Sequence, residues 1–213
     1  MSGLFITLEG CEGSGKSTQL ARLASGLRAA GAQVHALREP GGTTVGEQVR
    51  EILLSPAHEG MDAVTEVLLY EAARAEHVAR VIRPALASGA IVVCDRYADS
   101  STAYQGYGRG LDLGMVRSLN DWATGGLVPD RTIVLDVPPA EGLALATHDG
   151  ADRLEREAIA FHVRVREGYL SMAREEPERF VVVPRGDADE VFAAIAAALR
   201  SQLAGHGIRL EAS

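Results

Sequence analysis

One glycine-rich segment constrains this sequence more than any other feature. Residues 10–17 read GCEGSGKS and match the pattern GxxxxGK[ST]. A β-branched run at residues 4–9 precedes it, and residues 16–30 follow with apolar side chains at helical spacing. Between a strand and a helix, this pattern predicts a loop whose backbone N–H groups surround phosphate oxygens. The residues expected to bind a nucleoside triphosphate are Gly10, Cys11, Glu12, Gly13, Ser14, Gly15, Lys16, Ser17 and Thr18.

The alternative reading of this segment is a glycine-rich turn that only connects a strand to a helix. Lys16 and Ser17 argue against it, because a plain turn needs neither side chain. In the phosphate-binding reading, Lys16 reaches the β- and γ-phosphates and the Ser17 hydroxyl ligates Mg²⁺.

Strand-like and helix-like segments alternate along the rest of the chain. Further strands are expected at residues 33–38, 90–95, 132–136 and 179–183, and further helices at 45–54, 62–87, 100–104, 114–123, 155–174 and 188–203. This order predicts an α/β fold with a five-stranded parallel sheet and helices on both faces, and with the phosphate loop it corresponds to a three-layer P-loop fold. We expect a single domain over residues 1–213, with a frayed tail at about 204–213.

Charge and cysteine content narrow the class of partner. The formal net charge of −8 repels nucleic acid polymers, so small phosphorylated substrates are the expected ligands. Cys11 and Cys94 lie in no CxxC or Cys/His pattern and predict reduced thiols in a cytoplasmic protein. The longest apolar runs, such as residues 191–199, are too short to span a bilayer.

Charged residues follow the second and third predicted strands directly. Arg38 ends the second strand, and Asp95 and Arg96 follow the third. Carboxyl ends of parallel strands share one edge of a sheet, so these residues are expected beside the phosphate loop. There Asp95 would hold a Mg²⁺-bound water, and Arg96 would bridge the donor and acceptor phosphates. Taken one at a time, such acid and arginine pairs are more often surface salt bridges.

The predicted helix at residues 62–87 carries two stripes of side chains. Tyr70, Arg74 and His77 form one stripe and suit a platform for a nucleobase, in which the ring stacks and the guanidinium donates to a carbonyl. The alternative is an ordinary half-buried helix face. The second stripe is assigned to the core and consists of Leu68, Ala72, Ala75 and Ile82.

Five segments together make the sequence resemble the thymidylate kinase family from about residue 4 to residue 192. They are LEGCEGSGKST, REPGGT, EVLLYEAARAEHV, DRYADSSTAYQGYGRG and LDVPPAEGL, in this order. The resemblance implies Mg²⁺-dependent transfer of the γ-phosphoryl group of ATP to dTMP, for dTTP synthesis, by a homodimer. The dTMP-binding residues that it implies are Glu12, Arg38, Pro40, Tyr70, Arg74, Arg96, Ser101, Tyr104 and Gln105.

The resemblance also assigns a role to most of these residues. It implies that Glu12 binds the 3′-hydroxyl, that Arg38 and Arg96 bind the acceptor phosphate, and that Tyr104 crowds the 2′ position of the sugar. Thymine contacts are implied for Tyr70, Arg74, Ser101 and Gln105.

The sequence departs from the family pattern in the expected lid at about residues 144–155. Relatives with a phosphate loop of this type usually carry several lid arginines, and this segment contains only Arg153. We therefore expect Lys16, Arg96 and Arg153 as catalytic residues, with Arg156 a weaker substitute for Arg153. Two alternatives remain: a kinase for a related nucleotide, and a non-catalytic nucleotide-binding protein with a decayed lid. Glu71 occupies a position that is commonly apolar or aromatic in the family, and the sequence predicts no function for it.

Overall fold

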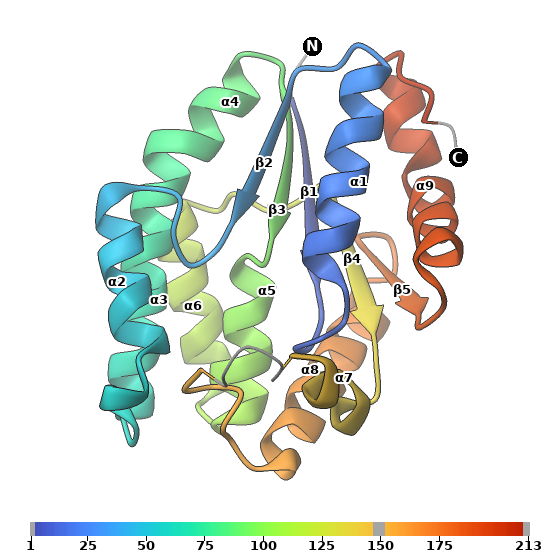
Figure 1. Cartoon of the computed structure of the whole chain (residues 1–213). Coiled ribbons are helices and arrows are strands. Elements are labelled where there is room, and N and C mark those ends of the chain that lie inside the picture. The colour runs from blue at the N-terminus through green and yellow to red at the C-terminus, as the bar shows by residue number, and fades with distance from the viewer. Residues whose placement is uncertain (1–2, 147–151, 211–213) are drawn as a thin grey trace.

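The computed structural model describes residues 3–146 and 152–210. Five parallel strands form one sheet in the order β2-β3-β1-β4-β5, which confirms the predicted architecture (Figure 1). The strands are β1 (Leu4–Glu9), β2 (Val34–Arg38), β3 (Ile91–Asp95), β4 (Arg131–Asp136) and β5 (Phe180–Pro184). The central position of β1 puts the loop that follows it in the middle of the carboxyl edge of the sheet.

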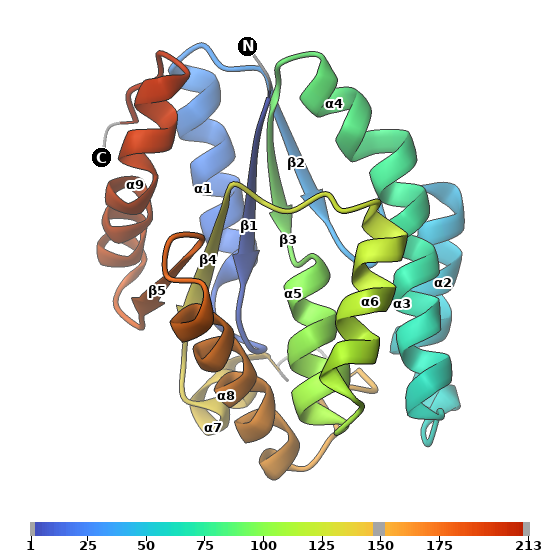
Figure 2. The same ribbon diagram turned by 180° about the vertical axis from the view of Figure 1, so that it is seen from behind.

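Helices cover both faces of the sheet, as Figures 1 and 2 show from opposite sides. They are α1 (Lys16–Ala29), α2 (Thr44–Leu54), α3 (Ala63–His77), α4 (Arg83–Ala87), α5 (Ala98–Ser101), α6 (Leu113–Thr124), α7 (Pro139–Ala146), α8 (Ile159–Glu175) and α9 (Ala188–Gly205). A short 3₁₀ helix, η1, spans Pro56–His58, and the π-helical turns η2 (Val78–Ile82) and η3 (Thr102–Gly108) follow α3 and α5.

Three of these elements differ from the sequence-based prediction. The helix expected over residues 62–87 is divided into α3, η2 and α4. The helix α8 begins at Ile159 and not at Glu155, because the Asp152 carboxylate accepts the backbone N–H groups of Leu154 and Glu155 and holds a turn there. The helix α7 was not predicted, and residues 144–146 of the expected lid form its last turn. Residues 147–151 of the lid lie outside the described part of the chain.

The strand β1 sends alternate side chains to the two faces of the sheet. Leu4, Ile6 and Leu8 pack in a core cluster with residues of α1 and α9. Phe5 packs on the opposite side with residues of η2 and α4, and Thr7 and Glu9 share that side because the side-chain period of a strand is two. The alternation therefore points the carboxylate of Glu9 into the layer that holds α5 and α8.

The assignment of Leu68 and Ala72 on α3 to the core was wrong. Leu68 is 50% exposed and Ala72 is also exposed, whereas Arg74 and His77 are buried at 2% and 0%. Of the predicted apolar stripe, only Ile82 is fully buried. The polar face turns inward because it is paired there: His77 and Arg74 both bind the buried carboxylate of Glu39.

Both cysteines are buried and free. Over the described residues, the helices include none with the length and apolar character that a membrane crossing needs.

Candidate active site

Left-handed glycines shape the loop between β1 and α1. Gly10, Gly13 and Gly15 have φ values of 137°, 65° and 87°, which side chains with a Cβ rarely adopt. A Cβ on Gly13 would also collide with the carbonyl oxygen of Gly142 in α7. The chain therefore turns tightly and presents backbone N–H groups at the start of α1, as the phosphate-binding prediction requires.

Lys16 is buried in this loop and lies over its backbone. Its Nζ donates to the carbonyl oxygens of Gly10 at 3.0 Å and Cys11 at 2.9 Å. Burial, with a smaller effect of the Arg96 charge, lowers the pKa of Lys16 to about 8. A phosphate anion bound by the loop would favour the charged form again.

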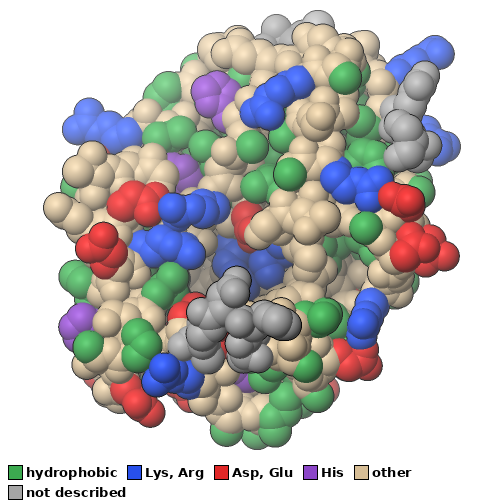
Figure 3. Space-filling model, in the orientation of Figure 1, with side chains coloured by type: hydrophobic (Ala, Val, Ile, Leu, Met, Phe, Trp, Pro, Cys, Tyr) green, Lys and Arg blue, Asp and Glu red, His purple; other side chains and the backbone are tan. Residues whose placement is uncertain are grey.

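Two cavities flank the loop and meet at Gly13. The first has a volume of about 290 Å³ and the second about 230 Å³. On the face seen in Figure 3, blue Lys and Arg side chains gather in the hollow at the centre of the molecule. The first cavity brings together most of the predicted site residues: Glu12, Gly13, Lys16, Ser17, Arg38, Pro40, Tyr70, Arg74, Asp95, Arg96, Ser101, Tyr104 and Gln105.

Ser17 and Asp95 form the part of this cavity that suits a divalent cation. The Ser17 hydroxyl donates to the Asp95 carboxylate at 3.2 Å, and both groups line the first cavity. Hydroxyl and carboxylate oxygens are the hard ligands that Mg²⁺ prefers. The donor set therefore fits the predicted Mg²⁺.

Arg96 occupies a left-handed conformation with φ of 69°, which is costly for a residue other than glycine. Its Nη1 donates to the Gly10 carbonyl at 3.0 Å, its Nη2 lies 3.1 Å from Glu12 Oε1, and its guanidinium lies 4.9 Å from the centre of the Tyr104 ring. The side chain thus crosses from the end of β3 to the phosphate loop. A strained backbone conformation of this kind is kept only where surrounding contacts hold the residue in place, as they do here.

Glu9 is the buried acid behind Arg96, and sequence reasoning missed it. One oxygen accepts the Tyr97 backbone N–H at 2.8 Å, and the other accepts the hydroxyls of Ser100 at 2.6 Å and Tyr169 at 2.8 Å. Burial, with repulsion from Asp99, raises the pKa of Glu9 to about 7. The glutamate holds the turn that carries Arg96. The signal in the sequence was a glutamate at the end of a mainly apolar strand.

Arg74 is fastened from several directions in the wall of the first cavity. Its guanidinium binds Glu39 at 2.8 Å, Glu71 at 2.5 Å, Ser101 at 2.9 Å and the side-chain oxygen of Asn120 at 2.9 Å. Burial opposes the charged form, but the two carboxylates raise the pKa of Arg74 above its usual range. Glu71, for which the sequence predicted no function, is thus a counter-ion of the proposed base-binding arginine.

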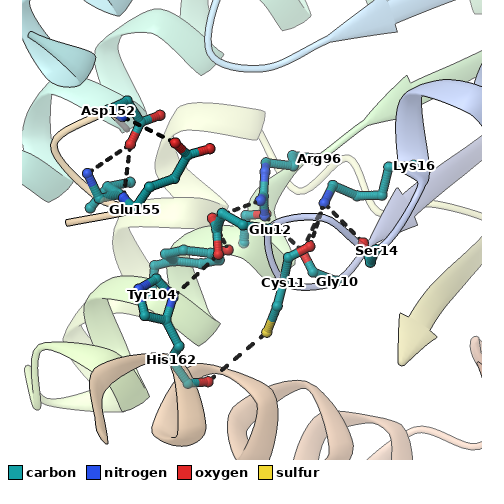
Figure 4. Close-up of polar contacts among 12 residues, drawn as sticks. Gly10, Cys11, Glu12, Ser14, Lys16, Arg96, Tyr104, Asp152, Glu155 and His162 are labelled. Carbon is teal, nitrogen blue, oxygen red and sulfur yellow. Dashed lines mark hydrogen bonds and ion pairs between the residues drawn. The ribbon is translucent and has the colours of Figure 1, made fainter. Parts of the chain in front are cut away.

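Glu12 projects from the phosphate loop into the first cavity. Its Oε1 accepts the Tyr104 hydroxyl at 2.5 Å and the Arg96 guanidinium at 3.1 Å (Figure 4). Burial would raise the pKa of Glu12, but contacts with His162, Arg96 and Lys16 together hold it well below its usual range. The carboxylate is therefore charged at neutral pH.

Two arginines from β2 and α2 also line the first cavity. Arg38 was predicted, and its guanidinium binds Glu47 at 2.9 Å. Arg50, on α2, was missed. Its Nη1 donates to the Pro40 carbonyl at 3.0 Å, and its side chain lines the cavity. The signal that could have found Arg50 was its place on the helix that follows the REPGGT turn, since a short turn returns the helix to the same rim.

Arg153 lies away from the first cavity, although Asp152, Leu154 and Glu155 line it. Arg153 is buried, and its Nη1 lies 2.6 Å from Glu66 Oε2. Glu66 also binds Gln105 at 2.8 Å and Arg109 at 3.0 Å. In this conformation the structure does not bring Arg153 together with Lys16 and Arg96.

The second cavity lies on the other side of the phosphate loop. Its lining includes Ser14, Gly15 and Thr18 from the loop, with Arg185 and Gly186 from the segment between β5 and α9. Gly10 and Cys11, the remaining predicted loop residues, contribute the carbonyls that bind Lys16. Arg185, which forms an ion pair with Glu141, was not predicted.

The parallel sheet, the phosphate loop on its central strand and the two cavities around that loop define a P-loop kinase. A family model described as thymidylate kinase matches residues 8–195, which is most of the chain. This chain belongs to the thymidylate kinase family.

Individual relatives agree with the family match. The thymidylate kinase of Deinococcus radiodurans is 56% identical over 182 residues, covering 85% of this chain and 88% of that protein. The thymidylate kinase of Pseudomonas fluorescens is 52% identical over 204 residues, covering 95% and 96%. A crystal structure of thymidylate kinase from Ehrlichia chaffeensis superposes with a TM-score of 0.76 at 35% identity, covering 94% of this chain and 99% of that one.

Proposed function

We propose that this protein transfers the γ-phosphoryl group of ATP to dTMP and releases ADP and dTDP. The observation that carries the proposal is the pair of cavities that meet at Gly13 of the phosphate loop. Two nucleotides bound there would have their phosphates on either side of Lys16 and Arg96. Holding two reactants in this way is the main requirement of phosphoryl transfer.

The second cavity is proposed to take the adenosine of ATP. Its walls combine loop residues with apolar side chains of β4, α7 and α9, which suits a nucleoside attached to loop-bound phosphates. Arg185 and Gly186 are then the residues nearest to the base. The lining of this cavity contains far fewer charged side chains than that of the first, which suits a neutral purine.

The first cavity is proposed to take dTMP. Arg38, Arg50 and Arg96 face the acceptor phosphate, and Arg74, Ser101 and Gln105 face the thymine, with Tyr70 against its ring. Because Arg74 is fixed by buried carboxylates and the Tyr97 carbonyl, its remaining Nη2–H would be held in place without reorganisation when the base binds. Rigid donors of this kind reject acceptors that lack the matching carbonyl.

Lys16 and Arg96 are proposed as the residues that stabilise negative charge on the transferring group. Ser17 and Asp95 would hold Mg²⁺ beside them, and this ion would neutralise charge on the ATP phosphates. The attacking phosphate oxygen of dTMP is already anionic near neutral pH, so the reaction needs no general base.

Arg153 is still proposed as an arginine that stabilises negative charge on the transferring phosphoryl group. To act there, its ion pair with Glu66 has to open when the nucleotides bind. The cost of opening is reduced because Arg109 and Gln105 continue to bind Glu66 after Arg153 leaves.

A homodimer is proposed through the outer faces of α2 and α3, which lie side by side in Figure 1. Ile52 on α2 is 41% exposed, and Val64 and Leu68 on α3 are 44% and 50% exposed. Three exposed branched aliphatic side chains on two adjacent helices suit a surface covered by a second copy of the chain.

The deciding experiment measures ADP release from MgATP with dTMP, dUMP, UMP, CMP and AMP as separate acceptors. The proposal predicts the highest kcat/KM with dTMP. A higher kcat/KM with another monophosphate would assign the protein to a different acceptor. Tight ATP binding without turnover of any of the five would assign a non-catalytic nucleotide-binding role.

A further inference from the structure

Three buried polar atoms without a hydrogen-bond partner belong to two residues that are in contact beside the phosphate loop. Within the described residues, these atoms are Oε2 of Glu12 and both ring nitrogens of His162. The Nδ1 of His162 lies 3.3 Å from Oε2 of Glu12, and His162 is completely buried. Figure 4 shows the imidazole beside Tyr104, joined to Glu12 by a dashed line. Buried polar groups rarely stay unpaired, so such a cluster points to a ligand or to a tighter bound state.

The two oxygens of Glu12 are not equivalent. Oε1 already accepts the Tyr104 hydroxyl at 2.5 Å and the Arg96 guanidinium at 3.1 Å. A carboxylate oxygen accepts about two hydrogen bonds, so Oε1 is saturated. Oε2 is therefore the oxygen with capacity for both His162 and a substrate hydroxyl. Because Oε2 is itself buried, the hydroxyl reaches it only when the carboxylate shifts toward the first cavity as the nucleotide binds.

His162 reaches Glu12 from inside the protein and not from the first cavity. Glu12 lines that cavity and His162 does not. The imidazole is held on α8, where its ring meets the Phe161 ring edge to face at 5.2 Å and its backbone carbonyl accepts the Cys11 thiol at 4.0 Å. The histidine is thus a fixed group behind the carboxylate, while Glu12 is also part of the lining of the first cavity.

We propose that His162 is a positioning residue for recognition of the acceptor's 3′-hydroxyl. In the nucleotide complex its Nδ1–H donates to Oε2 of Glu12 and fixes the shifted carboxylate, so that the remaining lone pair of Oε2 faces the hydroxyl of the nucleotide. Nδ1 faces the carboxylate of Glu12, which can only accept a hydrogen bond. This contact therefore selects the tautomer of His162 with the proton on Nδ1. The inference rests on the proposed function, because it requires dTMP in the first cavity with its sugar at Glu12.

The test compares two acceptors, dTMP and 3′-deoxythymidine monophosphate, which lacks the hydroxyl. In H162L the donor is lost, and we expect kcat/KM for dTMP to fall ~10-fold while that for the 3′-deoxy acceptor changes less than ~2-fold. KM for ATP is expected to stay unchanged. A loss confined to the acceptor that carries the hydroxyl is a result that a merely structural role would not produce.

Two polar variants provide a matched pair, because both keep an amide at the buried position. H162N places an amide nitrogen where Nδ1 lies and is expected to restore most of the discrimination between the two acceptors. H162Q places its amide near Nε2 and is expected to behave like H162L. This pair keeps the proposal testable even if H162L does not fold.

Equal losses for both acceptors, or an H162N enzyme indistinguishable from H162Q, would overturn the role of His162. If the wild-type protein phosphorylates neither acceptor, the proposed function has failed and not this inference alone. If it phosphorylates both equally well, the recognition of the 3′-hydroxyl by Glu12 is wrong.

Discussion

Arg153 and Glu66 form a buried ion pair, with 2.6 Å between Nη1 and Oε2. The two side chains are 3% and 0% exposed. Nε of Arg153 also donates to the Leu53 carbonyl at 2.8 Å, so this arginine ties the segment after the lid to α2 and α3. An arginine expected at the reacting phosphates is thus in a structural position in this conformation.

The first prediction concerns the variant R153A. Removing one partner of a buried pair lowers the free energy of unfolding, here by about 3 kcal/mol, since Glu66 keeps its other donors. The proposed catalytic role predicts in addition that kcat falls at least ~100-fold well below the unfolding midpoint. Urea denaturation and steady-state kinetics on the same preparation measure both effects.

R109A is the matched control for R153A. Arg109 also binds Glu66, at 3.0 Å, and lies outside the lining of the first cavity. We expect it to lower stability with little change in kcat. If R153A destabilises the protein but leaves kcat unchanged, Arg153 is a structural residue and its catalytic role is rejected.

The second prediction concerns the pH dependence of stability through Glu9. Burial, with repulsion from Asp99, raises its pKa to about 7 in the folded protein from 4.5, so between these values the folded state keeps a proton that the unfolded state releases. The stabilisation from this proton is therefore complete below pH 4.5 and is lost as the pH rises through 7. E9Q removes the titration.

Relative to E9Q, the wild-type free energy of unfolding is expected to fall by about 2 kcal/mol between pH 5 and pH 8. Urea denaturation of both proteins at each pH measures this difference. Parallel pH profiles for the two proteins would show that Glu9 titrates normally, in disagreement with its buried position.

The third prediction is proton uptake when ADP or ATP binds above neutral pH. The pKa of Lys16 is about 8 in the free protein, mainly because of burial, and bound phosphates restore its charged form. At pH 8.5 nucleotide binding should take up a proton at Lys16, whereas at pH 6.5 Lys16 is already charged. Calorimetric titration in two buffers of different ionisation enthalpy measures the uptake.

K16M provides the control for this experiment because methionine cannot titrate. Proton uptake at pH 8.5 should disappear in K16M. The turnover rate of K16M should also fall at least ~100-fold. Equal uptake in K16M and the wild-type protein would assign the proton to another group.

The fourth prediction tests the proposed dimer surface with L68E. A charge at this half-exposed position on α3 would be desolvated in an interface, so we expect dissociation to a monomer. V163E is the matched control, because Val163 on α8 is 43% exposed and lies outside the proposed surface. Sedimentation equilibrium measures the molar mass of the wild-type protein and of both variants in solution. A wild-type monomer, or an L68E protein of unchanged mass, would refute the surface.

Local patterns were sufficient to predict the sheet, the phosphate loop and the residues at the strand ends. The parallel order was confirmed, the loop glycines adopt positive φ values, and the lining of the first cavity includes residues of the REPGGT and DRY segments. Sequence reasoning failed on α3, where the exposed aliphatic residues were assigned to the core. It failed because a hydrophobicity pattern cannot show that a buried carboxylate from another segment, Glu39, pairs with Arg74 and His77.

The sequence by itself determined the glycine-rich loop that we propose binds phosphate and the strand ends that form the edge around it. Those features depend on backbone geometry within a few residues and on apolar periodicity, and both can be read along the chain. Only the tertiary structure decided that Glu9 lies behind Arg96, that Arg50 joins the cavity and that His162 meets Glu12. The physical reason is that each of these contacts joins elements distant in the chain, and packing sets their relative positions.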